Sequence, residues 1–287
     1  MTSDAVGATS VYYTPYQGNI VPIYNGANID SYSFSQLTMA LSGTNQLSGM
    51  VYDLFIFLYS GVVVIGAGPA WSSTTSRGTG SGTTQLAMVD GLWTNAYLMT
   101  LTNGTTTYSN IAVGKATYVG SVYMTANGQT TMQFEPAGAG GGTNNVLGLY
   151  NAYNRVLTSS RSIDATADWL CTTTVFQAAN SSNNNRINWL DGLQQSFVFA
   201  EYQVQASCTT SGGTNVAYVA IGLDSTTSAQ SSVFGDTVAA TMSIRAASDI
   251  LPQLGFHYVQ ALEMGPGGAG TYYFGTTTMH VKAILEM

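Results

Sequence analysis

The chain has 287 residues, of which 45% are hydrophobic and only 7% are charged, whereas roughly a quarter of residues are charged in ordinary globular proteins. Seven basic residues stand against fourteen acidic ones, which gives a net charge of −7, and the basic residues form no cluster. This balance disfavours nucleic-acid binding, which depends on phosphate neutralisation, and attraction to an anionic membrane surface. An aromatic content of 11% also argues against a disordered chain.

The predicted elements are nearly all β-strands, because helix-forming Lys, Glu and Arg are rare whereas Thr, Val, Tyr and Gly are abundant. The first strand signals fall at residues 11–13, 20–24, 51–59, 62–65, 86–89, 96–102 and 105–109. The best helical candidate is a connector at residues 32–41. The apolar run 50–70 is long enough to suggest a membrane span. However, Asp53 and three glycines interrupt it, so we interpret it as two buried strands that turn at Ser60-Gly61.

Strand signals continue at residues 118–125, 130–134, 150–157, 169–174, 186–190, 195–206, 216–223, 238–245, 257–264 and 271–285. Between the first two of these, Asn127-Gly128 is a strong signal for a two-residue hairpin turn. Stretches rich in Gly, Ser and Thr predict mobile loops at residues 72–84, 137–143 and 207–215.

Many short strands separated by Gly and Asn turns predict an all-β protein. We place a domain boundary near Val113-Gly114. Residues 1–113 then hold about seven strands, enough for a small β-sandwich. Residues 114–287 hold about ten, which predicts a second β-sandwich of jelly-roll type.

Candidate catalytic and metal-binding residues are sparse. His257 and His280 have no neighbouring His or Cys at ligand spacing, so we interpret both as core or cross-strand histidines. Asp164, Asp168 and Asp224 look like carboxylates that cap turns, and we favour this role over catalysis. No Gly-x-Ser-x-Gly, His-Glu-x-x-His or calcium-loop pattern occurs. We therefore predict a protein that is not an enzyme and holds no cofactor or metal.

The two cysteines, Cys171 and Cys208, are too few for a disulfide framework. We favour two small buried apolar residues, and a disulfide across neighbouring strands is the alternative. The eighteen tyrosines and four tryptophans suit adaptive binding surfaces, including carbohydrate recognition. Tyr is also a good strand residue that packs sheets, and this plainer reading holds for most single tyrosines.

Several segments in a fixed order carry a family resemblance. The most specific one is Tyr150-Asn-Ala-Tyr-Asn-Arg-Val. The others are Val11-Tyr-Tyr-Thr-Pro-Tyr, Val21-Pro-Ile-Tyr-Asn-Gly, Val51-Tyr-Asp-Leu-Phe, Gly68-Pro-Ala-Trp, Tyr118-Val-Gly-Ser-Val, Ile221-Gly-Leu-Asp-Ser and Gly255-Phe-His-Tyr-Val. Over residues 11–263 the chain resembles a family of tailed-bacteriophage virion proteins of the tail fibre or appendage type. The resemblance implies a virion component with β-rich domains and supplies no catalytic residue.

The candidate site residues are those of the most specific segment: Tyr150, Asn151, Tyr153, Asn154 and Arg155. We predict a structural role for them, with the two tyrosines facing the core. Asn154 and Arg155 have several donors with which to bond the nearby backbone or a carboxylate. Asn also tolerates the left-handed backbone of a turn.

The predicted function is that of a virion tail fibre or spike subunit that mediates host attachment. The alternatives are a capsid decoration or head-fibre protein and, from another class, a glycan-degrading tailspike enzyme. A surface poor in charge and rich in aromatic residues suits protein interfaces. We therefore expect a homo-oligomer, a trimer, in contact with other virion proteins and with a host surface glycan or protein.

Overall fold

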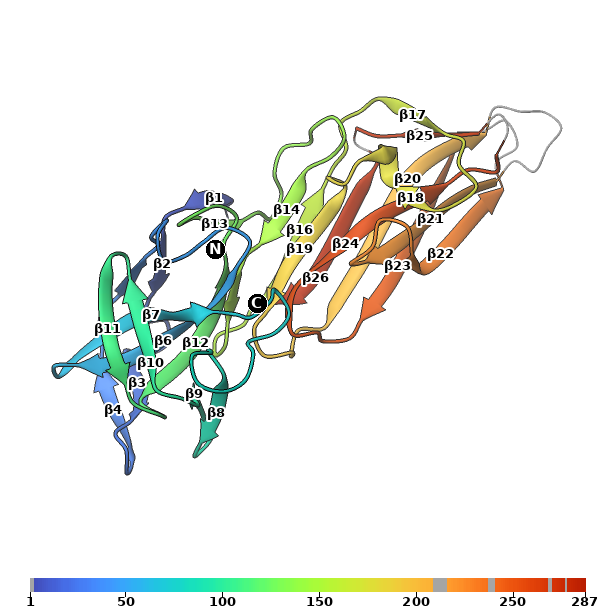
Figure 1. The fold of residues 1–287 in the computed structure, drawn as a ribbon. Helices are drawn as coiled ribbons and strands as arrows, with labels where there is room; N and C mark the ends of the chain where they lie inside the picture. Colours follow the sequence, from blue (N-terminus) through green and yellow to red (C-terminus); the bar gives the residue numbers. More distant parts are fainter. Residues whose placement is uncertain (1–2, 209–215, 237–240, 268–269, 277) are drawn as a thin grey trace.

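The computed structural model describes residues 3–208, 216–236, 241–267, 270–276 and 278–287. Within these ranges the only helical element is a 3₁₀ turn at Ala179–Ser181, and the other regular elements are strands. The all-β prediction is therefore confirmed. The strands form two units that lie end to end (Figure 1). In the same ranges, no helix has the length and apolar character needed to cross a membrane.

The first unit is built on one large antiparallel sheet with the order β11-β10-β7-β6-β12-β9-β8. Two antiparallel strand pairs, β2–β5 and the hairpin β3–β4, cover one face of it and enclose a core that contains Ile23, Met39, Leu54 and Ile56. The bounds of the strands are β2 Ser10–Tyr13, β3 Ile20–Tyr24, β4 Ile29–Ser33, β5 Leu37–Ala40, β6 Val51–Tyr59, β7 Val62–Ala70, β8 Leu86–Val89, β9 Leu92–Asn95, β10 Met99–Asn103, β11 Thr106–Ile111 and β12 Ala116–Tyr123.

The apolar run 50–70 forms the central hairpin β6–β7, as predicted. Ser60 and Gly61 make its turn with φ of 51° and 79°. The helix predicted at residues 32–41 is wrong, since β4 ends at Ser33 and β5 covers Leu37–Ala40. Tyr32, Phe34 and Leu37 pack against the first core from an extended chain, so the burial of apolar side chains decides the conformation there.

The second unit is a sandwich of two sheets around one core. One sheet has the order β1-β13-β14-β19-β24-β21-β22, with β18 also paired to β24. The other has the order β16-β26-β20-β25-β17, with β23 also paired to β20. Trp189 from the first sheet and Tyr202 from the second lie in the shared core.

The first sheet of this sandwich is made of β1 Ala5–Ala8, β13 Thr130–Met132, β14 Asn144–Leu147, β18 Gln177–Ala178, β19 Arg186–Asp191, β21 Val216–Leu223, β22 Ala229–Asp236 and β24 Gly255–Met264. The second is made of β16 Leu157–Ser162, β17 Asp168–Cys171, β20 Val198–Cys208, β23 Met242–Ile250, β25 Thr271–Phe274 and β26 His280–Glu286.

The strand pairing does not divide the two units at Val113-Gly114, where we expected a domain boundary. The position falls between β11 and β12, which belong to the same sheet, and β12 pairs with β6 along its length. A later strand, β15 (Leu149–Asn151), also pairs with β12. Conversely, β1 joins the sandwich of the second unit by pairing with β13. The two units are therefore interleaved in sequence, because the chain crosses the junction more than once.

The turn at Asn127-Gly128 forms, but the long hairpin does not. Ala126 and Gln129 bridge across the turn, and Gly128 has a φ of 68°. The strands on either side then diverge, since β12 stays in the first unit and β13 enters the second. This turn is one of the places where the chain passes from one unit to the other.

The cysteine register argues against a disulfide. Cys171 on β17 and Cys208 on β20 are both paired with Thr271 of β25, which lies between their strands. Two strand spacings amount to roughly 9–10 Å, which exceeds the Cα separation that a disulfide bridges. Cys171 is buried as a free thiol.

The predicted loops have different outcomes. Loop 72–84 is held in place by its buried Arg77 and Thr84. Loop 137–143 is fixed at Gly141, whose N–H donates to Asp164. Residues 209–215 of the third predicted loop lie outside the described residues.

Candidate functional site

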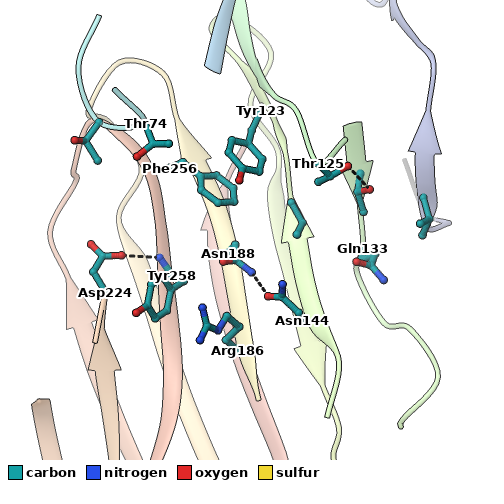
Figure 2. Close-up of a pocket in the computed structure, with 14 residues that line it drawn as sticks. Thr74, Tyr123, Thr125, Gln133, Asn144, Arg186, Asn188, Asp224, Phe256 and Tyr258 are labelled. Atoms are coloured by element: carbon teal, nitrogen blue, oxygen red, sulfur yellow. Dashed lines mark hydrogen bonds between the residues drawn. The ribbon is translucent and has the colours of Figure 1, made fainter. Parts of the chain in front are cut away.

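A hollow of about 760 Å³ lies between the two units, on the outer face of the first sheet of the sandwich. Strands β13, β14, β19 and β24 form its floor, and segments of the first unit form its rim (Figure 2). Its lining combines aromatic, amide, hydroxyl and charged side chains: Val6, Thr74, Thr75, Tyr123, Thr125, Thr131, Gln133, Asn144, Val146, Arg186, Asn188, Asp224, Phe256 and Tyr258.

The alternation of β19 places its polar side chains on the floor. Ile187 and Trp189 point into the core of the sandwich, so Arg186 and Asn188 point to the opposite face, as side chains do at every second position of a strand. In the parallel pair β14–β19, Asn144 lies beside Arg186. In the antiparallel pair β19–β24, Asn188 lies beside Tyr258.

Hydrogen bonds hold the amides of the floor in fixed orientations. Asn188 Nδ2 donates to Asn144 Oδ1 over 2.6 Å and to the carbonyl oxygen of Asn145 over 2.7 Å. Because Asn188 is buried, a rotated amide would leave donors without partners, at a cost of about 1–3 kcal/mol. The polar pattern on the floor is therefore preorganised.

Arg186 is the only basic residue among the described residues of the lining. Its Cζ lies 4.3 Å from the ring centroid of Tyr258, a cation–π contact. Its Nε donates to Gln260 Oε1 over 3.1 Å. Among the described residues no carboxylate lies within 4.0 Å of the guanidinium. Burial lowers the pKa of Arg186, and the neighbouring Tyr258 opposes this shift.

Asp224 is the only carboxylate in the part of the lining that the structure describes, and it is paired. Oδ1 accepts the N–H of Tyr258 over 2.9 Å, and Oδ2 lies 2.7 Å from His257 Nδ1. The other ring nitrogen of His257 lies 3.1 Å from the carbonyl oxygen of Leu254. Burial acts to lower the pKa of His257, but the hydrogen bond and charge of Asp224 outweigh it and raise the pKa above its usual value.

The rim of the hollow comes from the first unit. The rings of Tyr123 and Phe256 stack across the junction, with centroids 3.6 Å apart and planes 7° from parallel. The carbonyl oxygen of Thr74 accepts the N–H of Phe256 over 2.9 Å. The shape of the hollow therefore depends on how the two units are joined.

The residues predicted as a site lie outside this hollow. Tyr150 is buried in a small core at the junction, as predicted. The prediction for Tyr153 is wrong, since its side chain is 52% exposed. Asn151 Oδ1 accepts the N–H groups of Tyr153 and Asn154, which closes a turn and leaves the tyrosine outside the sheet. With Tyr12, Tyr13, Tyr16 and Phe34, these three residues line a second hollow of about 460 Å³.

Arg155 lacks the backbone or carboxylate partner that was predicted for it. Neither a hydrogen bond nor an ion pair joins it to a described residue, and its Nη1 is buried without a partner. No carboxylate of the described residues forms an ion pair with Arg155.

Of the other polar residues, Asp164 and His280 have their predicted roles, whereas the carboxylate of Asp168 makes no hydrogen bond to a described residue. Asp164 is buried and accepts N–H groups of Gly141 and Thr166 as well as the amides of Asn180 and Asn185. Burial acts to raise the pKa of Asp164, but the hydrogen bonds lower it. His280 lies 3.3 Å from Glu201 across β26 and β20. Asp168 is exposed at the start of β17.

Sequence reasoning missed Arg186, Asn188 and Tyr258 as neighbours in one site. The alternation of polar and apolar residues from Arg186 to Trp189 was a usable signal for a strand with one polar face. The parallel pairing of β14 with β19 has no local signal, however. In the described part of the chain, no three His, Cys, Asp or Glu side chains gather as metal ligands would.

No family model matches this sequence, and no curated protein matches it. Among solved structures, a Bacillus thuringiensis Cry1Da tryptic core variant is similar, with 8% sequence identity and a TM-score of 0.22. The match covers 98% of this chain and 51% of that one, so the chain spans about half the length of the toxin core. A likeness this distant indicates no function.

Proposed function

We propose that this protein is a subunit of a bacteriophage virion appendage, of the tail fibre or spike kind, and that it takes part in host attachment. The observation that carries the proposal is the hollow between the two units. Rings, fixed amides, hydroxyls and one guanidinium meet there on the open face of a sheet. This is the chemistry of adaptive recognition of a polar surface, such as a cell-surface glycan.

The lining of the hollow supports binding over glycan hydrolysis. Glycoside hydrolysis commonly uses two carboxylates on either side of the bond that is cleaved. Asp224 is the single carboxylate among the fourteen lining residues, and both of its oxygens are engaged. A glycan-degrading tailspike therefore stays the weaker alternative.

A homo-oligomer, in our proposal a trimer, is the working unit. Exposed apolar and aromatic side chains gather around the second hollow, and such clusters are typical of protein interfaces. Tyr12, Tyr16 and Ile20 are 57%, 73% and 63% exposed. Light scattering on the purified protein tests this part, and a 30.2 kDa species at micromolar concentration would contradict it.

Antibody fragments raised against the purified chain test the attachment role on intact virions. We expect gold-labelled fragments to mark the tail and unlabelled fragments to block adsorption to host cells. Label on the capsid with adsorption unchanged would instead support the alternative, a capsid decoration protein.

A further inference from the structure

We infer that the hollow between the two units binds a saccharide that carries a carboxylate, such as a uronic acid residue, and that Arg186 holds this carboxylate. The inference rests on the proposed function, because it names the ligand class that the same hollow would meet on a host surface.

The charge of Arg186 has no acidic partner among the described residues. The side chain is half-buried, yet no carboxylate of the described residues lies within 4.0 Å of it. Arg155 also lacks an acidic partner, but Arg186 is the unpaired arginine that lines this hollow. A ligand anion would offset the cost of taking this charge partly out of water.

The guanidinium of Arg186 is held in one orientation by two neighbouring side chains. The ring of Tyr258 supports one face, and Nε is engaged by Gln260. Neither Nη group donates to a described residue, so the end of the planar group that carries both is left for a ligand. Two parallel N–H groups match the two oxygens of a carboxylate.

The charges of the lining favour a ligand with a single negative charge. Among the described residues that line the hollow, Arg186 is the only cation, and Asp224 lies on the same lining within a chain of net charge −7. A phosphate monoester carries about −1.5 to −2 at neutral pH, which one guanidinium would not balance beside Asp224. A carboxylate carries a single charge and is therefore the better match.

The neutral part of the lining suits the rest of a sugar residue. The side-chain amide of Gln133 and the hydroxyls of Tyr123 and Tyr258 make no hydrogen bond to the described residues, although all three line the hollow. Figure 2 shows Gln133, Tyr123 and Tyr258 around the amide pair of Asn144 and Asn188. Free donors and acceptors around aromatic rings suit the hydroxyls and the ring of a sugar.

The decisive experiment compares polymers that differ only in the carboxylate. Binding of the purified full-length chain is measured by biolayer interferometry to an immobilised polyuronate and to the same polymer after its carboxyl groups are reduced to alcohols. We expect the reduced polymer to bind at least tenfold more weakly, and added salt to weaken binding to the acidic form.

Variants then place the carboxylate at Arg186. Arg186→Gln should lose about tenfold or more in affinity for the polyuronate, the usual loss for a charge-assisted hydrogen bond. Arg186→Lys keeps the charge but loses the two parallel N–H groups of the guanidinium. Its affinity for the polyuronate should therefore lie between those of the wild type and Arg186→Gln. The matched control Arg245→Gln removes an exposed arginine from the other sheet and should change nothing. Melting curves of all variants report folding.

Each outcome has a separate meaning. Equal binding of both polymers would overturn the inference, and so would an unchanged affinity of a folded Arg186→Gln variant. Tight binding of a polyol phosphate polymer, tested in parallel, without binding of the polyuronate would also overturn it. In all these cases the adsorption assay with antibody fragments still decides the attachment role, because it does not depend on the ligand.

Discussion

Arg77 of the first unit donates a hydrogen bond of 2.6 Å from Nη2 to the backbone carbonyl oxygen of Gly192 in the second unit. The same guanidinium forms a two-point ion pair with the fully buried Asp53, at 2.6 and 3.0 Å. Trp71 lies against it, with the ring centroid 4.3 Å from Cζ. A buried charge pair of the first unit thus fixes the position of a backbone turn of the second.

We predict that Arg77→Met destabilises the protein by about 3–5 kcal/mol, because it leaves Asp53 buried without a counter-charge. The double variant Asp53→Leu/Arg77→Met should cost less than Arg77→Met alone, since no unpaired charge remains. Urea unfolding followed by tryptophan fluorescence measures both. A double variant that is less stable than the single one would contradict this account.

Gly192 is predicted to tolerate no side chain. A Cβ at this position would collide with the hydroxyl of Tyr118 and the ring of Tyr150. Gly192→Ala should therefore cost about 1–3 kcal/mol through overpacking. The control is Gly18→Ala, where a Cβ meets nothing within 4 Å. Thermal melting of both variants tests the prediction, and equal melting temperatures would show that the junction is looser than the structure indicates.

Much of the fold could be predicted from local patterns. The hairpin at Ser60-Gly61 was readable because an apolar run of this length with a turn signal has few other solutions. The segment 32–41 misled because its apolar spacing suits a turn of helix, and only the core beneath Phe34 and Leu37 shows otherwise. The boundary near Val113 misled because strand count says nothing about which strands pair.

The site was much less predictable. Asp224 was correctly read as a cap, because an acid after an apolar strand has a local meaning. The meeting of Asn144 with Arg186 depends on a parallel pair of strands about 40 residues apart in sequence. Arg77 lies in the stretch 72–84, whose glycine and serine content predicted a mobile loop. Composition alone does not show that one arginine of such a loop is buried and paired.

The pair of His257 and Asp224 should make stability depend on pH. Both ring nitrogens of His257 face acceptors, so the imidazolium form satisfies both contacts. Because the pKa is raised in the folded protein, the stabilisation is complete below the unfolded value near 6.5 and is lost as pH rises through the folded value.

Asp224→Asn should therefore lower the melting temperature more at pH 5.5 than at pH 9. The substituted amide oxygen can still accept the N–H of Tyr258, which isolates the effect on His257. Asp249→Asn, an exposed carboxylate on β23, is the matched control. A deficit that is equal at both pH values would show that His257 is neutral throughout.

The carboxyl group of Glu263 should also make the folded protein less stable as pH rises. Burial raises its pKa to about 7, although hydrogen bonds from Trp169, Gln177 and the N–H of Asn180 act to lower it. The protonated form therefore stabilises the fold fully below the unfolded pKa, and this contribution is lost as pH rises through about 7. The effect is on the order of 3 kcal/mol at most.

Glu263→Gln removes this titration. We expect the wild-type protein to lose more stability between pH 5 and pH 8 than Glu263→Gln does, as measured by urea unfolding at each pH. The comparison uses the slope with pH, because the amide also changes the contact with Trp169 at every pH. Parallel slopes would mean that Glu263 keeps one protonation state over this range.

The guanidinium of Arg155 should contribute little to the stability of the protein. Its Nη1 is buried without a partner, and Tyr150 beside it also has a buried hydroxyl without one. Burial raises the pKa of Tyr150 to about 12, with the charge of Arg155 opposing the shift. A buried donor without a partner costs about 1–3 kcal/mol, whereas an apolar group of similar shape does not. Arg155→Met should therefore melt at or above the wild-type temperature.

The control for this variant is Arg245→Met, which removes an exposed arginine paired with Glu201 at 3.3 Å and should change stability by less than about 1 kcal/mol. A clear loss of stability in Arg155→Met alone would show that its guanidinium has a structural partner after all. If Arg155→Met melts like the wild type, forms the same oligomer and yet abolishes host adsorption, the guanidinium acts at a receptor surface. That result would move the attachment site from the hollow at Arg186 to the turn closed by Asn151.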